Sequence, residues 1–145
     1  MAIHTGVFLF LNSLFVFLIY SYSYRYRFRI DSRYGMSVAM IAGGGLAVGT
    51  GVLLIYDFPV YYMEVTIIST ITGMVVGSLI GYLYDFQTML TGFMNGLMSG
   101  IMAPMIGAAA NYSLLFGIVI EVFLFVSFLF VFLITKLSFR TSGER

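Results

Sequence analysis

The chain has no cysteine and no tryptophan, and His4 is its only histidine. Without thiols the chain forms no disulfide, supplies no thiolate ligand to a metal and offers no attachment point for a bacterial lipoprotein anchor. A zinc site built from His and Cys is excluded as well. The sequence also has no Gly-Lys-Ser/Thr phosphate loop and no second histidine to activate a nucleophile, so we predict that it is not an enzyme.

Charged residues are also scarce. They make up 9% of the chain, whereas hydrophobic residues make up 61%. A water-soluble globule of this size cannot bury so much apolar surface, so the composition indicates an integral membrane protein. Crossing a hydrocarbon core of about 30 Å takes about 20 helical residues. We predict one all-α transmembrane domain over residues 1–145, with five spans at about 3–22, 35–56, 64–84, 89–110 and 112–136.

Basic residues set the expected orientation, because Lys and Arg near span ends stay on the cytoplasmic side. With five spans, the basic residues after the first span and those after the fifth fall on the same side, and no Lys or Arg is left for the other. They are Arg25, Arg27, Arg29 and Arg33 in the first group and Lys136, Arg140 and Arg145 in the second. We therefore predict a multi-pass protein of the cytoplasmic membrane with its N-terminus outside and its C-terminus inside. The alternation of Tyr and Arg after the first span indicates contact with anionic lipid rather than with nucleic acid.

Glycine recurs at four-residue spacing in the second, third and fourth spans. In lipid, small residues at this spacing let two helix backbones approach closely, which is a main source of helix association. The pattern predicts glycine-zipper packing of these spans, and self-association through any small face left over. The first and fifth spans are instead crowded with Phe and Leu, which suits an outer layer. The glycines concerned are Gly45, Gly49, Gly73, Gly77, Gly81, Gly92, Gly96 and Gly100.

Two segments of the chain look like copies of each other with a shift of 28 residues. Gly45-Leu-Ala-Val-Gly49-Thr50 matches Gly73-Met-Val-Val-Gly77-Ser78, and Tyr56-Asp57-Phe58 matches Tyr84-Asp85-Phe86. Because consecutive spans run in opposite directions, segments 45–58 and 73–86 are expected to form an inverted repeat, an arrangement that places sites at a repeat interface in transporters. Chance similarity within an apolar sequence of low complexity is the alternative.

Polar residues inside the spans are few, and in a membrane they mark function or helix contacts. Glu121 is the one carboxylate well inside a span. It is a candidate for proton coupling, and the alternative is that it clamps a neighbouring helix. Asn12 and Asn95 are candidates for lining a polar pathway or for hydrogen bonding between helices. Pro104 removes an amide donor and frees the carbonyl of Gly100, which predicts either a carbonyl facing a cavity or a packing kink.

Methionines line one face of the fourth span. At about 100° per residue, Met94, Met98, Met102 and Met105 fall within an arc of about 80°, opposite the glycines of the same span. Thioethers bind soft Cu(I) and bind hard ions poorly, so these four residues are the candidate metal ligands. Flexible hydrophobic packing is the alternative.

The Met94-xxx-Met98-xxx-Met102 pattern resembles the paired-methionine helix of the Ctr-type copper transporters, which is also accompanied by a helix with small residues at four-residue spacing. The likeness covers about a dozen residues, and those proteins have three spans rather than five. The Gly- and Met-rich block from Met36 to Ala110 also resembles that of small uncharacterised bacterial polytopic membrane proteins, a likeness that implies no activity.

Two functions from different classes remain open. The first is a transporter or channel for a small cation such as Cu(I), with the methionines as transient ligands and Glu121 as a coupling acid. It predicts that the methionines line an interior path or a path at the axis of an oligomer. The second is a non-catalytic structural or assembly subunit of a larger membrane complex, in which the methionines meet bulky side chains or lipid. Both hypotheses place the chain in a lipid bilayer, as a homo-oligomer or as a subunit of a complex.

Overall fold

A computed structural model describes residues 2–26, 28 and 31–142, and these residues form five helices and no strand. The helices are α1 (Ala2–Tyr26), α2 (Ser32–Asp57), α3 (Tyr62–Tyr82), α4 (Phe86–Ala109) and α5 (Leu114–Ser142). By length and composition, all five are able to cross a membrane. The prediction of an all-α, multi-pass membrane protein is therefore confirmed.

The helix ends differ from the predicted span ends where polar residues continue a helix or start one. α1 continues beyond its apolar run as far as Tyr26, through a segment that contains Tyr and Arg. α4 starts at Phe86, earlier than predicted, because the Asp85 carboxylate accepts a hydrogen bond from the Phe86 amide at 2.8 Å. Between α4 and α5 the chain reverses through Asn111 and Tyr112, which have φ values of 53° and 55°.

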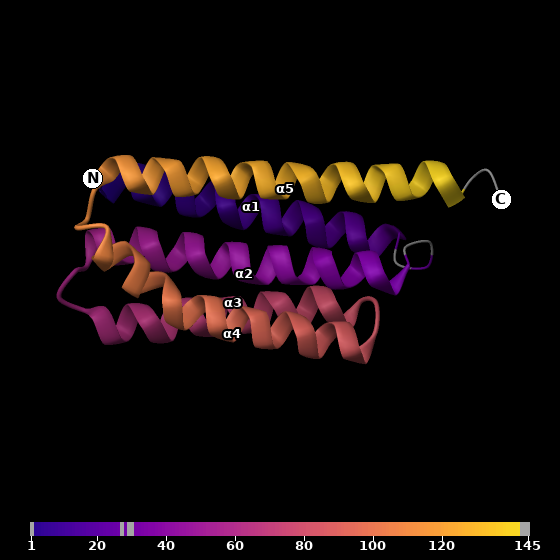
Figure 1. The fold of residues 1–145 in the computed structure, drawn as a ribbon, viewed down its shortest axis with the longest axis horizontal. Coiled ribbons are helices and arrows are strands. Elements are labelled where there is room, and N and C mark those ends of the chain that lie inside the picture. The colour runs from indigo at the N-terminus through magenta and orange to yellow at the C-terminus, as the bar shows by residue number, and fades with distance from the viewer. Residues whose placement is uncertain (1, 27, 29–30, 143–145) are drawn as a thin grey trace.

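α2 lies in the middle of the bundle, between the α1/α5 pair and the α3/α4 pair (Figure 1). Within its 18-residue apolar stretch, 67% of the residues are buried inside the protein, a larger share than in any other helix. α1 and α5 run in the same direction, and each packs on α2 more than on the other. α1 begins and α5 ends at opposite ends of the bundle (Figure 1).

Small residues bring α2, α3 and α4 together almost backbone to backbone. A Cβ atom on Gly77 would strike the carbonyl of Gly92, and one on Gly96 would strike the carbonyl of Gly73. A Cβ on Gly43 would lie 2.7 Å from the Cα of Gly77. At these three contacts no side chain separates the two backbones, an arrangement that favours close packing in lipid.

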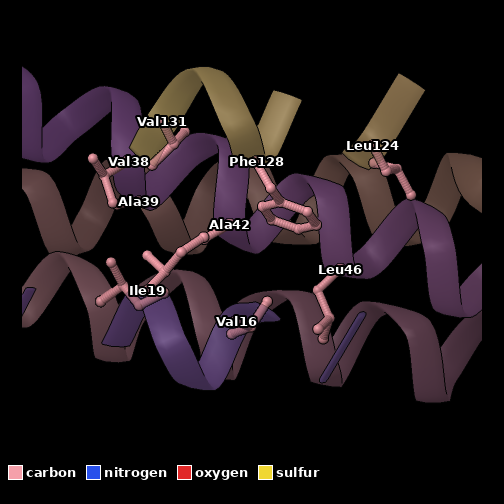
Figure 2. Close-up of a cluster of buried hydrophobic side chains, with 10 residues drawn as sticks. Val16, Ile19, Val38, Ala39, Ala42, Leu46, Leu124, Phe128 and Val131 are labelled. Carbon is pink, nitrogen blue, oxygen red and sulfur yellow. The ribbon is translucent and has the colours of Figure 1, made fainter. Parts of the chain in front are cut away.

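α1 and α5 are attached to α2 by interlocking side chains rather than by backbone contact. Figure 2 shows the cluster that joins the three helices. α2 contributes small residues, among them Ala39 and Ala42, which are fully buried. The larger side chains are Val16 and Ile19 of α1, Val38 and Leu46 of α2, Ile80 of α3, and Leu124, Phe128 and Val131 of α5. The bundle thus has a close-packed half, α2 to α4, and a half packed through larger side chains, α1 and α5.

Candidate functional site

The four candidate metal ligands lie on the outer side of α4, which we call the methionine face. Met94, Met98, Met102 and Met105 are 48%, 59%, 54% and 65% exposed. The opposite side of α4 is buried, because Gly92, Gly96 and Gly100 lie against the backbone of α3. The methionine face is therefore open to lipid or to another polypeptide, and it does not point into the protomer.

The chemistry available on this face is that of thioethers alone. Among the described residues, no group of three or more His, Cys, Asp or Glu is placed to hold a metal ion. Residues four apart on one helix have Cβ atoms about 5–6 Å apart, one turn above each other. The methionines of α4 alone therefore cannot place three thioethers at one height.

Glu121 and Asn12 form a hydrogen-bonded pair between α5 and α1. The Asn12 side-chain amide donates to Glu121 Oε1 at 3.0 Å and lies 3.2 Å from Oε2. The pair rests on α2, since a Cβ on Gly49 would lie 2.9 Å from the Asn12 Nδ2 atom. α2 separates this pair from α4 (Figure 1). The coupling acid and the metal ligands of the transport hypothesis thus lie on different sides of one protomer.

The other polar side chains at depth also join helices. Asn95 donates from Nδ2 to the Met40 carbonyl at 2.7 Å, which links α4 to α2. Ser69 donates from Oγ to the Gly100 carbonyl at 2.8 Å, within the buried contact of α3 with α4. This carbonyl is the acceptor that Pro104 leaves without an amide donor. It faces a hydroxyl of the next helix rather than a cavity.

The predicted glycines occupy two kinds of contact. Gly73, Gly77, Gly81, Gly92, Gly96 and Gly100 meet backbone atoms across the contact of α3 with α4. Gly45 and Gly49 instead receive side chains from the outer helices, namely Leu124, Phe128 and Asn12.

Three residues outside the predicted four-residue glycine spacing complete these contacts. A Cβ on Gly51 would strike Ala103, and Gly43 and Ser69 lie against α3 and α4 as described above. The run of three glycines at 43–45 was a usable signal for Gly43. Ser69 had no such signal, because its role depends on a carbonyl of another helix.

The two segments of the predicted repeat each carry a tyrosine over a glycine of another helix. A Cβ on Gly117 would lie 2.8 Å from the Tyr56 ring, and one on Gly35 would lie 2.6 Å from the Tyr84 ring. Tyr84 donates from its hydroxyl to Ser23 Oγ at 2.9 Å, whereas the buried Tyr56 hydroxyl has no hydrogen-bond partner among the described residues. Burial raises the pKa of Tyr84, and its hydrogen bond with Ser23 lowers the pKa by less. The inverted repeat stays a prediction.

No protein family, curated protein or solved structure matches the chain. Its function is therefore inferred from the geometry of its own residues.

Proposed function

We propose that the protein is a non-catalytic structural or assembly subunit of a larger membrane complex and that it binds an apolar transmembrane helix of a partner through the methionine face. The observation that carries this proposal is the outward position of all four methionines on a helix held by backbone contacts on its other side. Methionine side chains are flexible and polarizable, so they adapt to a partner of irregular shape. The exposed side of α4 also presents Leu90 and Ile101, so an apolar partner fits it.

The engaged polar groups support an assembly role over a path through one protomer. Three of the side chains considered for a polar pathway or a cavity wall, Asn12, Glu121 and Asn95, hydrogen bond within the protomer. The carbonyl freed by Pro104 is also engaged, by Ser69. Such groups stabilise helix contacts in a membrane.

The test is a pair of substitutions on the methionine face, read from the size of the complex that the protein forms in its native membrane. Met98→Trp places a bulky ring on the face and should release the protein from the complex on a native gel. Phe123→Trp is the matched control, because Phe123 is an exposed residue of α5 that lies on neither the methionine face nor a cavity wall. A complex that survives Met98→Trp unchanged would overturn the proposal.

A soft-cation path at the axis of an oligomer is the second candidate function, and the row of exposed thioethers favours it. Several copies meeting at their methionine faces would bring thioethers from different chains to one height, which suits Cu(I). Replacing Met94, Met98 and Met102 together by Leu conserves volume and should leave assembly intact. Under this candidate the same variant loses anaerobic Cu(I) binding, measured against a competing chelator. Under the assembly proposal neither the wild type nor the variant binds Cu(I) tightly.

We further propose that the protein lies in the cytoplasmic membrane with its N-terminus outside and its C-terminus inside, and that the close-packed helices form a glycine zipper. Arg25, Arg33, Lys136 and Arg140 support this orientation, since they lie at one end of the bundle. Arg27, Arg29 and Arg145 lie outside the described residues. Since the chain has no cysteine, Ser113→Cys and Ser32→Cys give single thiols at opposite ends. An impermeant maleimide added to intact cells should label the first and not the second.

A further inference from the structure

A long apolar groove runs between α1 and α5, open to the outside of the bundle. Its larger part has a volume of about 330 Å³ and its smaller part about 220 Å³. Phe15 and Phe125 line both parts, so the two parts adjoin, and Asn12 and Glu121 line the smaller one. It exists because α1 and α5 each pack on α2 more than on each other. Most of its wall is aromatic and aliphatic, with Phe15, Leu18, Ile19, Phe125, Phe128 and Leu129 in the larger part.

The groove becomes polar and then basic toward the carboxyl ends of α1 and α5. Ser23 and Thr135 line it at this end. Beyond them, Arg25 lies seven residues after Leu18, and Lys136 lies seven residues after Leu129. Residues seven apart share one face of a helix, so each cation continues a wall of the groove. Both are exposed.

Two further described cations and two described carboxylates lie at this end of the bundle. Arg33 lies in the first turn of α2, and Arg140 lies one turn beyond Lys136. The two described carboxylates at this end belong to connections between helices. Asp31 precedes α2, and Asp85 precedes α4, where it accepts the Phe86 amide. The helix faces that continue the two walls of the groove therefore carry Arg25 and Lys136 and no described carboxylate at this end.

We propose that the groove holds one anionic phospholipid of the surrounding membrane, with an acyl chain along the phenylalanines and the phosphate between Arg25 and Lys136. An apolar groove that opens to the bilayer suits an acyl chain, and basic side chains between transmembrane helices bind anionic headgroups. A zwitterionic lipid has the same chains and lacks the net negative charge that the two cations attract. Inorganic phosphate has the charge and lacks the chain. This proposal does not rest on the function proposed above.

The test is native mass spectrometry of the full-length protein released from detergent, with phosphatidylglycerol and phosphatidylcholine of the same acyl chains in competition. The wild type should retain phosphatidylglycerol in preference, and excess inorganic phosphate should not displace it. Each cation near the membrane surface contributes about 1 kcal/mol, so Arg25→Gln or Lys136→Gln should weaken phosphatidylglycerol binding roughly fivefold. Arg33→Gln is the matched control at the same end and should change binding less than twofold.

The acyl part is tested by filling the groove. Leu129→Trp should lower the binding of both lipids, whereas Leu115→Trp, at an exposed position of α5 that does not line the groove, should leave both unchanged. If Leu129→Trp does not give a folded protein by thermal melting, Leu18→Trp fills the groove from α1. Equal retention of the two lipids by the wild type overturns the proposal. So does a loss in Arg33→Gln as large as that in Arg25→Gln, or full lipid binding by a folded protein whose groove is filled.

Discussion

Gly96→Ala probes the closest approach of α3 and α4. A Cβ on Gly96 would strike the Gly73 carbonyl group and lie 2.8 Å from the Met74 amide nitrogen. All of these are backbone atoms, so the clash is relieved only if the two helices separate. Overpacking of this kind costs about 1–3 kcal/mol, and separation also weakens the nearby Ser69 hydrogen bond, worth about 1 kcal/mol. The higher helix propensity of Ala returns up to about 1 kcal/mol.

The expected result is a free energy of unfolding lower by about 2 kcal/mol. The assay is reversible unfolding by SDS in mixed micelles, followed by far-UV circular dichroism. Gly6→Ala is the matched control, because a Cβ on Gly6 meets nothing within 4 Å. This control should be neutral or stabilising by up to about 1 kcal/mol. If Gly96→Ala were as stable as Gly6→Ala, backbone contact between α3 and α4 would not be what holds them.

Three more predictions use the same unfolding assay. Ser69→Ala should lower the free energy of unfolding by about 1–3 kcal/mol, because it leaves the buried Gly100 carbonyl without a donor. Pro104→Ala supplies an amide to that carbonyl, so Ser69→Ala should destabilise the Pro104→Ala variant less than it destabilises the wild type. Additive losses in the double variant would refute the interpretation. Glu121→Leu should cost about 0.6–2 kcal/mol by removing the acceptor of a hydrogen bond between helices, and Glu121→Gln clearly less; equal losses would contradict this. Tyr84→Phe should cost about 1 kcal/mol at neutral pH, whereas Tyr56→Phe should cost nothing. Burial raises the pKa of Tyr84 above its ordinary 10.0, so the stability that Tyr84 contributes is complete below pH 10 and is lost as the pH rises through the folded pKa. Above pH 10 the free energy of unfolding of the wild type should therefore fall more steeply than that of Tyr84→Phe. Parallel plots of this free energy against pH would show that the ionisation of Tyr84 is not coupled to folding.

Hydropathy predicted the five helices because length and apolar composition decide whether a segment crosses a membrane. The ends of the helices were less predictable, since a single capping residue such as Asp85 moves a boundary by several residues. Glycine spacing identified faces that touch other helices, but spacing fixes a face and not its neighbour. Gly45 and Gly49 accordingly receive side chains of α1 and α5, while Gly73 and Gly77 meet the α4 backbone.

In the candidate site, too, the sequence predicts which residues share a helix face but not what that face meets. The sequence placed the four methionines on one face of one helix, and only the arrangement of helices shows that this face points outward. Ser69 escaped notice because it is an ordinary hydroxyl until Pro104, on another helix, leaves a carbonyl to be satisfied. The groove between α1 and α5 is likewise invisible in the sequence, since it depends on how far two helices distant in the chain lie from each other.

The central claim is that the methionine face is an interface between polypeptides. The most direct measurement places a photo-crosslinking phenylalanine analogue at Met98 in the native membrane and, as a control, at Phe123 of α5. We expect a protein adduct at Met98, identified by mass spectrometry as one defined transmembrane polypeptide, and no such adduct at Phe123. An adduct to a second copy of this chain, joined with Cu(I) binding that the triple Leu variant loses, would favour the soft-cation path over assembly. Lipid adducts alone at Met98 would contradict the claim, because the face would then meet only the bilayer.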